Sequence, residues 1–296
     1  MASFLFAPAP LSAEENIAVL YPEVKAPYHT VFQTIIDGVA SVPGLRVKGY
    51  PLSQDFDRDE LDRWIQSENI GGGIALGKWG FQAARSLDPN LPIVVGALQF
   101  APGDHSGISL AIDPDQAFRI IRELVPSTRR VWVVYSPRNN GWLIELAEQA
   151  ARKHGLEFSA LAVSDMRDAA RRYRELLNEV RPEEDAVWLP LDDVSVNDDV
   201  ILPMLLEASW SRNIVMFSSN LSHVQKGILF AVYPDNHAMG RRLGEMISAY
   251  RRTAVAPGAA PAADLQVAMN TRTAAHLGLR LTARQQRKIV ATFPSR

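Results

Sequence analysis

A glycine–lysine motif in the first third of the sequence has the spacing of a nucleotide-binding loop. Four residues separate Gly72 from Gly77, and Lys78 follows directly. A P-loop uses this spacing to place backbone N–H groups and a lysine around phosphates, and it needs Ser or Thr next to bind magnesium. Trp79 occupies that position here, and the intervening Gly-Ile-Ala-Leu is typical of a buried strand. We therefore do not expect nucleoside triphosphate binding.

Other catalytic and metal-binding patterns are missing from the sequence. The absence of cysteine excludes disulfides, zinc ribbons, thiol catalysis and a lipid anchored through cysteine. No two of the six histidines have a metal-ligand spacing, and there is no Gly-x-Ser-x-Gly or Gly-x-Gly-x-x-Gly. The paired acids Asp192–Asp193 and Asp198–Asp199 are neighbours in sequence, which favours capping or solvation over catalysis. We predict no catalytic residue, no metal and no cofactor.

What remains is a set of polar and aromatic residues that follow predicted strands. In open α/β sheets, ligands bind at the carboxyl ends of the strands, where helix N-termini supply free N–H groups. We predict that these residues line a ligand-binding cleft, although each one alone is also consistent with capping or solvation. In the first half they are Tyr21, Glu23, Tyr28, Lys78, Trp79, Gln99 and Phe100. In the second half they are Asn139, Asn140, Trp142, Asp192, Asp193, Ser218, Ser219, Asn220 and, before a helix, Asp235.

Alternating strands and helices must position these residues. The first half predicts strands at 17–21, 45–50, 73–76 and 93–98, separated by helices at 28–39, 58–66 and 79–86. The second half predicts strands at 131–135, 157–163, 186–189 and 214–217, separated by helices at 141–153, 166–180 and 201–209. This alternation indicates an α/β fold with parallel sheets covered by helices.

The two halves repeat one another. Gly71 lies 50 residues after Tyr21, and Ala186 lies 51 residues after Tyr135. Each half then ends in a strand, an Asp suited to capping (Asp113 and Asp235) and a helix. The spacing therefore predicts two similar Rossmann-like lobes. We expect an exposed connection at 253–263, a strand at 265–269 and a terminal helix at 283–291.

Composition indicates a globular protein of two domains. The chain has 296 residues, is 47% hydrophobic and 22% charged, and carries a formal net charge of −2. Such a balance argues against nucleic acid as a partner. The last 26 residues contain six Lys or Arg and no acid, which predicts a solvated terminal helix or, alternatively, a phosphate-binding surface.

The N-terminus has the character of an export signal. Residues 2–13 are apolar and small, and a polar stretch begins at Glu14, so we predict a remnant of a signal peptide with cleavage after Ala13. The alternative is a disordered N-terminus. No run reaches the roughly 20 apolar residues of a membrane span. We therefore expect an exported, soluble, periplasmic protein that is not a lipoprotein.

Four motifs resemble one known family. They are GILFAVYPDNHAMGRRLG at 227–244, VAMNTRTAAHLGL at 267–279, VVYSP at 133–137 and WLPLDD at 188–193. In these motifs the chain resembles the ABC-transporter substrate-binding proteins of periplasmic binding protein type I fold, in the branch associated with tryptophan and tyrosine uptake. The resemblance implies two lobes that close over a small molecule. It also implies three crossovers forming a hinge, near 112–113, 233–234 and 262–265.

The resemblance also implies lobe boundaries and site positions. Lobe 1 would comprise 14–112 with 234–262, and lobe 2 would comprise 113–233 with 263–296. Binding positions would lie near Glu23, Lys78, Gln99, Asn139, Asp192 and Ser219. Lys78-Trp79 and Gln99-Phe100 depart from the residues usual in the family, so an aromatic amino acid is not assumed as the ligand.

We therefore expect a periplasmic solute-binding protein that performs no chemistry. It would capture an amino-acid-like or other small anionic or aromatic metabolite and deliver it, as a monomer, to an ABC permease or another membrane receptor. Ligand would favour the closed state that the partner recognises. The alternative is a sensor or accessory protein without its own transporter. A third and less favoured hypothesis is that the protein is an α/β enzyme.

Overall fold

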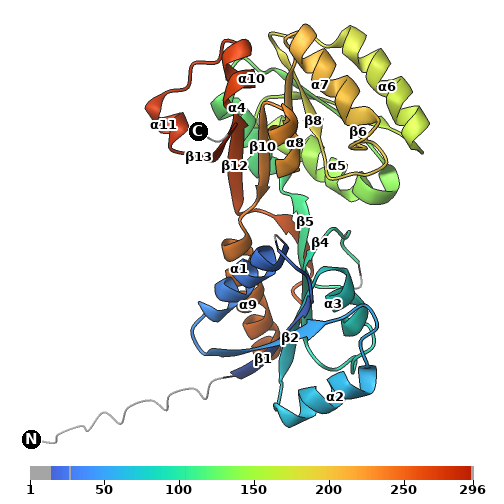
Figure 1. Ribbon diagram of the computed structural model, residues 1–296, viewed down its shortest axis with the longest axis vertical. Helices are drawn as coiled ribbons and strands as arrows, with labels where there is room; N and C mark the ends of the chain where they lie inside the picture. The colour runs from blue at the N-terminus through green and yellow to red at the C-terminus, as the bar shows by residue number, and fades with distance from the viewer. Residues whose placement is uncertain (1–14, 27, 104, 295–296) are drawn as a thin grey trace, which may run out of the picture. The chain divides into compact units, whose positions relative to one another are not determined.

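The computed structural model describes residues 15–26, 28–103 and 105–294, so the signal-peptide prediction lies outside the described residues. Two compact units are formed (Figure 1). The first comprises the described residues up to Gly96 together with Asn236–Pro257, and the second comprises Ala97–Asp235 together with the described residues from Gly258. The lobe boundaries given above stay a prediction.

The first sheet has six strands in the order β11-β5-β4-β3-β1-β2. Its strands are β1 (Glu15–Pro22), β2 (Leu45–Leu52), β3 (Gly72–Leu76), β4 (Ile93–Leu98), β5 (Gly107–Ile112) and β11 (Ala259–Ala262). The pairs β1–β2, β1–β3, β3–β4 and β5–β11 are parallel. The helices of the first unit are α1 (Tyr28–Ala40), α2 (Arg58–Ser67), α3 (Gly77–Ala84) and α9 (Asn236–Thr253). All five residues of β3 are buried, which confirms the strand predicted inside the glycine–lysine motif.

The second sheet has seven strands in the order β13-β12-β10-β9-β8-β6-β7. They are β6 (Arg130–Tyr135), β7 (Glu157–Ala162), β8 (Asp185–Leu189), β9 (Val215–Ser218), β10 (Phe230–Pro234), β12 (Leu265–Asn270) and β13 (Ile289–Phe293). The pairing of β10 with β12 is antiparallel and the other pairings are parallel. The helices are α4 (Pro114–Leu124), α5 (Pro137–Lys153), α6 (Met166–Glu179), α7 (Ile201–Ser211), α8 (Leu221–Lys226), α10 (Thr271–His276) and α11 (Ala283–Gln286).

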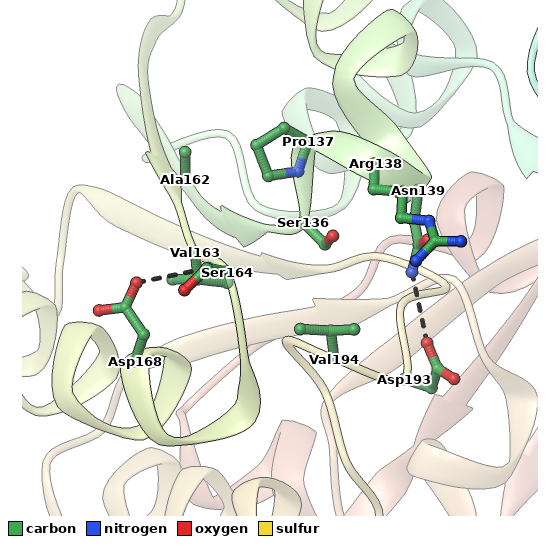
Figure 2. Close-up of a pocket in the computed structure, with 10 residues that line it drawn as sticks. All are labelled: Ser136, Pro137, Arg138, Asn139, Ala162, Val163, Ser164, Asp168, Asp193 and Val194. Carbon is green, nitrogen blue, oxygen red and sulfur yellow. Dashed lines mark hydrogen bonds between the residues drawn. The ribbon is translucent and has the colours of Figure 1, made fainter.

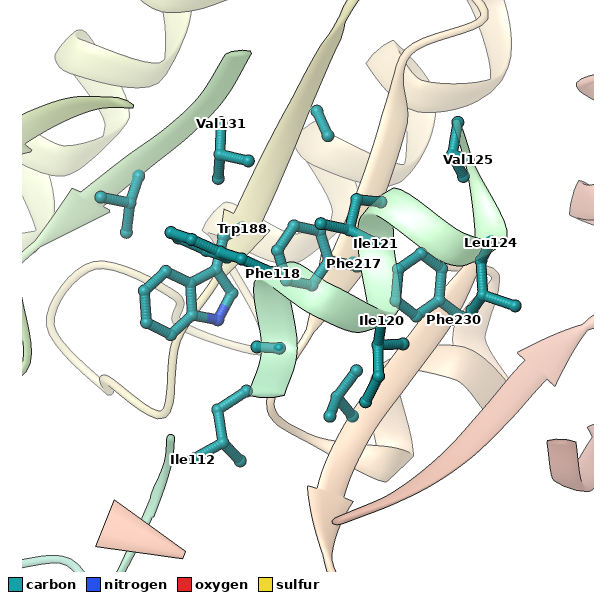
Figure 3. Close-up of a cluster of buried hydrophobic side chains, with 14 of the residues drawn as sticks. Ile112, Phe118, Ile120, Ile121, Leu124, Val125, Val131, Trp188, Phe217 and Phe230 are labelled. Atoms are coloured by element: carbon teal, nitrogen blue, oxygen red, sulfur yellow. The ribbon is translucent and has the colours of Figure 1, made fainter. Parts of the chain in front are cut away.

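Both faces of the second sheet are buried, as expected for parallel strands covered by helices. Alternate residues of β6 enter different clusters: Val131 and Val133 pack with α4 and α5, whereas Trp132 and Val134 pack with α6 and α7. The first cluster contains a row of aromatic rings (Figure 3). Its rings stack or meet edge to face: Phe118–Trp188 at 5.9 Å, Trp188–Phe217 at 6.3 Å and Phe217–Phe230 at 5.3 Å between centroids.

Three element predictions were wrong. The terminal helix 283–291 is instead the single turn α11 followed by strand β13, because Thr282 and Gln285 cap a short helix and the β-branched residues after it pair with β12. The connection 253–263 contains strand β11, which pairs with β5. Helix α5 begins at Pro137 rather than Gly141, since proline is favoured in the first helical turn.

Candidate functional site

The switch point of the second sheet lies between β6 and β8. From β6 the chain moves to β7 on one side and later to β8 on the other, so the segments after β6 and β8 diverge at this edge. Such a point in an open α/β sheet is the usual position of a ligand. Residues 136–140 follow β6 and begin α5, and residues 190–196 follow β8.

A buried carboxylate joins these two segments. Asp192 is 6% exposed. Its Oδ2 accepts a hydrogen bond from the backbone N–H of Ser136 at 2.6 Å, and its Oδ1 accepts from Asn139 Nδ2 and from the backbone N–H of Val194, each at 3.1 Å. The carboxylate therefore fixes both the start of α5 and the turn after β8.

Gln99 joins a third segment to these two. We call the hydrogen-bonded group the Asp192 cluster, and its members are Gln99, Ser136, Asn139, Asn140, Leu191, Asp192 and Val194. Its Nε2 donates to Asn140 Oδ1 at 3.1 Å and to the carbonyl oxygen of Leu191 at 2.8 Å. The buried Asn140 donates its Nδ2 to the same carbonyl at 3.2 Å. Gln99 was assigned to the first half of the site from its sequence position, but its side chain bonds residues of the second unit. The polar groups of Asn140 thus position the segment after β8.

A hollow of about 710 Å³ opens beside this cluster (Figure 2). Arg138, Asn139 and Asp193 lie along one side, and Ser164 and Asp168 lie along the other. Asn139 Nδ2 also donates to Asp193 Oδ1 at 3.3 Å. The exposed Arg138 side chain makes no ion pair with any described residue. The hollow therefore presents a free guanidinium together with carboxylates.

Asp168 is an ionised acid at the rim of the hollow. Arg171 NH2 donates to its Oδ1 at 2.5 Å, and this bond is the largest cause that lowers the pKa of Asp168. The backbone N–H of Ser164 donates to Oδ2 at 3.4 Å. Arg171 therefore meets part of the charge of Asp168, whereas the exposed Asp193 makes no ion pair with any described residue.

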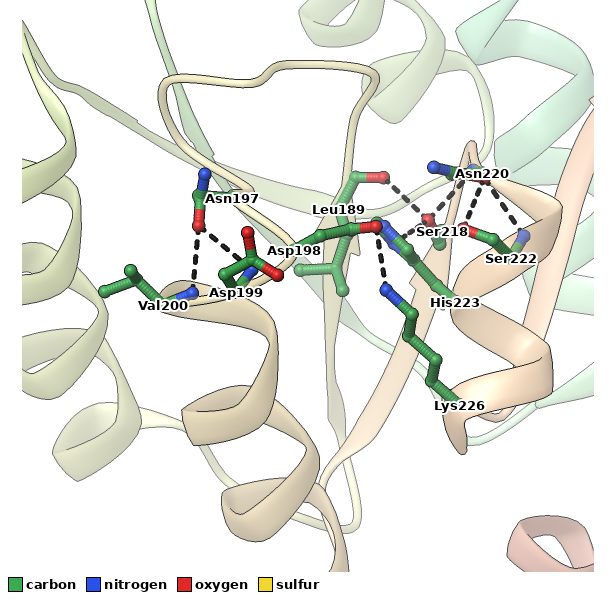
Figure 4. Close-up of polar contacts among 10 residues, drawn as sticks. All are labelled: Leu189, Asn197, Asp198, Asp199, Val200, Ser218, Asn220, Ser222, His223 and Lys226. Carbon is green, nitrogen blue, oxygen red and sulfur yellow. Dashed lines mark hydrogen bonds and ion pairs between the residues drawn. The ribbon is translucent and has the colours of Figure 1, made fainter.

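A third segment, after β9, is tied to a buried histidine (Figure 4). Ser218 Oγ lies 2.8 Å from His223 Nδ1, and His223 Nε2 lies 2.9 Å from Asp198 Oδ1. Lys226 Nζ donates to Asp198 Oδ2 at 2.8 Å, and the backbone N–H of Asn220 donates to Ser218 Oγ at 2.9 Å.

These contacts have the residue types of a catalytic triad. However, Ser218 is 0% and His223 is 2% exposed, so no substrate reaches the hydroxyl. The network instead fixes the turn that carries Ser219 and Asn220. The sequence does not predict this network, because Asp198 is 25 residues from His223 and no local spacing links them.

The buried histidine predicts a pH-dependent stability. Burial is the largest cause that lowers the pKa of His223 from its ordinary 6.5, against the opposing effect of Asp198. The folded protein therefore takes up fewer protons than the unfolded chain as the pH falls below 6.5, and stability is lost in that direction. We expect His223→Gln to reduce this loss in urea unfolding measured at several pH values, whereas exposed His29→Gln should leave it unchanged. Parallel curves for the wild type and His223→Gln would contradict this assignment.

The remaining predicted residues of the second unit have other partners. Ser219 is buried and accepts a hydrogen bond from Trp188 Nε1 at 3.0 Å, which links the site to the aromatic core. Trp142 packs on that core, and its indole nitrogen is buried without a hydrogen-bond partner among the described residues. Asp235 accepts from Gln266 Nε2 at 3.0 Å. No hydrogen bond of the Trp142 side chain to a described residue links it to the Asp192 cluster.

The first unit has its own switch point, between β1 and β3. Lys78, in the first turn of α3, is exposed and makes no ion pair with any described residue. Trp79 is partly buried against the cluster that contains Leu20 and Leu61. Gly77 has φ +66°, a left-handed conformation that favours glycine, so the strand turns directly into the helix without a phosphate-binding loop.

The other predicted residues of this face differ in exposure. Tyr21 is half-buried, with its ring over Gly49, whereas Glu23 is exposed and Tyr28 is 67% exposed. Phe100 donates its backbone N–H to Ser109 Oγ at 3.1 Å.

The described part of the chain contains no group of three His, Asp or Glu side chains that could hold a metal ion. It also contains no helix with the length and apolar character needed to cross a bilayer.

Comparison with known proteins decides the family. The family model described as ABC transporter substrate binding protein matches residues 94–289, which include every residue of the Asp192 cluster. The chain belongs to this family. A tyrosine-binding protein of Clostridioides difficile strain R20291 is 21% identical over 179 residues, which are 56% of this chain and 50% of that protein. The chain therefore spans about half the length of this relative.

Two solved structures share the fold. One is the ligand-free, open structure of a substrate-binding protein with adhesive properties from Clostridium difficile, at 14% identity and a TM-score of 0.64, covering 94% of this chain and 98% of that chain. The other is an ABC domain in complex with L-Trp from Streptococcus pneumonia, at 19% identity and a TM-score of 0.56, covering 95% and 100%. The fold is that of the type I periplasmic binding proteins, with two Rossmann-like lobes, as predicted.

Proposed function

We propose that this protein captures a small organic solute at its switch-point segments in the periplasm and delivers it to an ABC importer. The observation that carries the proposal is the Asp192 cluster, which holds the segments after β6 and β8 in a fixed arrangement beside an open hollow. Fixed polar groups around an open hollow suit recognition of a small molecule, because little ordering entropy is lost when it binds.

An amino-acid-like solute fits the charges of this hollow. The free guanidinium of Arg138 suits a carboxylate, and the carboxylate of Asp193, which makes no ion pair with any described residue, suits an ammonium group. Two similar proteins support this class of solute: one is a tyrosine-binding protein, and the other is an ABC domain in complex with L-Trp.

Delivery to an importer is tested by uptake. Radiolabelled solute should accumulate in membrane vesicles that contain the cognate permease and ATPase only when the loaded protein is added. Binding without transport by any neighbouring permease would instead support the sensor or accessory role.

A substitution of Lys78 tests whether the first unit contributes to solute binding. We expect Lys78→Ala to weaken an anionic solute at least tenfold, about 1.4 kcal/mol, because an exposed ammonium at a helix start is free to pair with a carboxylate. Titration calorimetry measures the change, and Lys78→Arg, which retains the charge, should lose less affinity than Lys78→Ala. Unaltered affinity in Lys78→Ala would place this side chain outside the site.

A further inference from the structure

The C-terminal part of the second unit is strongly basic. Residues 271–294 contain no Asp or Glu, and their cations are Arg272, Arg280, Arg284, Arg287 and Lys288. This segment forms α10, α11 and β13, and β13 is the edge strand of the second sheet (Figure 1). We call the surface formed by residues 271–294 the basic edge.

Little of this charge is neutralised by the rest of the unit. Glu123 of α4 accepts from Lys288 Nζ at 2.5 Å and lies 3.9 Å from Arg284 Nε. Arg272, Arg280 and Arg287 are exposed, and their side chains make no ion pair with any described residue. In helix α6, by contrast, acids neutralise neighbouring arginines, because Arg171 and Arg172 pair with Asp168 and Glu175 on the same helix. The basic edge therefore carries an uncompensated positive charge.

Exposed apolar side chains accompany these cations. Val290 of β13 is 58% exposed. Trp210 is 52% exposed and stacks on His276 of α10 at 3.7 Å between ring centroids. Trp210 also lines a hollow of about 610 Å³ together with Arg272 and Phe293. Cations next to an exposed tryptophan and other apolar groups are the composition of surfaces that rest on lipid headgroups.

We propose that the basic edge binds the anionic headgroups of a membrane surface. Its cations are spread over α10, α11 and the connections on either side of α11 instead of converging on one point, which suits a sheet of phosphates better than one free phosphate. Each cation near an anionic bilayer strengthens binding by about fivefold. Such binding would concentrate the protein at a membrane, and it stands independently of the identity of the solute.

The test uses the full chain and sedimentation with vesicles. The probes are phosphatidylcholine vesicles with and without about a third phosphatidylglycerol, in about 0.1 M salt. We expect binding only to the anionic vesicles, and at least a tenfold loss in the double variant Arg280→Glu/Arg287→Glu. The matched control is Arg167→Glu/Arg174→Glu on α6, which changes the net charge equally and should bind like the wild type. Circular dichroism confirms that both variants fold.

Three outcomes would overturn the proposal. They are equal binding to neutral and anionic vesicles, equal losses in the two double variants, and suppression of vesicle binding by millimolar inorganic phosphate at constant ionic strength. Retention on an acidic polypeptide without any vesicle binding would also overturn it, in favour of an acidic protein partner.

Discussion

Gly240→Ala is expected to lower the free energy of unfolding of the first unit by about 3 kcal/mol. Helices α1 and α9 meet at two glycines, and a Cβ on Gly240 would lie 1.9 Å from the carbonyl oxygen of Ile35. A Cβ on Gly38 would lie 2.1 Å from the carbonyl oxygen of His237. Because the obstructing atoms are backbone, a rotamer change does not relieve the clash and the helices must separate.

Urea unfolding followed by circular dichroism measures this effect. The control is Gly141→Ala in α5, where an added Cβ meets nothing within 4 Å. Alanine is the better helix former, so this variant should gain up to about 1 kcal/mol. A Gly240→Ala protein as stable as the Gly141→Ala control would show that the two helices do not require this close approach.

Asp192→Ala should remove both stability and solute binding. The substitution leaves the buried N–H of Ser136 and its neighbours without their acceptor, and each unsatisfied group costs about 1–3 kcal/mol. We therefore expect a loss of about 3 kcal/mol in the free energy of unfolding. We also expect at least a tenfold weaker affinity, because the segments after β6 and β8 lose their common anchor.

Asp193→Ala is the matched control for this prediction. Asp193 is exposed and accepts one hydrogen bond, from Asn139 at 3.3 Å, so its loss should change stability by less than about 0.5 kcal/mol. A change in solute affinity in Asp193→Ala would show whether the Asp193 carboxylate contacts the solute directly. Equal destabilisation by the two variants would contradict the role given to Asp192.

The sequence predicts most of the strands, because apolar runs bounded by turn residues are typical of buried strands. The run Val131–Val134 is apolar at every position, as a strand buried on both faces must be. The last strand, β13, was missed because Lys and Gln before it favour helix, whereas pairing with β12 decides the outcome.

For the candidate site, the sequence predicts which residues follow the strands but not which contacts they make. Position after a strand was enough to single out Asn139 and Asp192, which the structure joins by a hydrogen bond. The position of Gln99 after a strand of the first half predicts a place in the first half of the site. Nothing in the sequence indicates that the Gln99 side chain bonds Asn140, which is 41 residues away. Long-range polar contacts depend on the packing of whole elements, and local patterns do not encode them.

A thermal-shift screen over amino acids, purines and small organic acids tests whether this protein binds a small solute. We expect at least one compound to stabilise the wild type by about 2.7 kcal/mol at a hundredfold excess over its dissociation constant. The same compound should stabilise Asp192→Ala and Lys78→Ala less. If no compound raises the melting temperature of the folded wild-type protein, the proposed solute binding is contradicted.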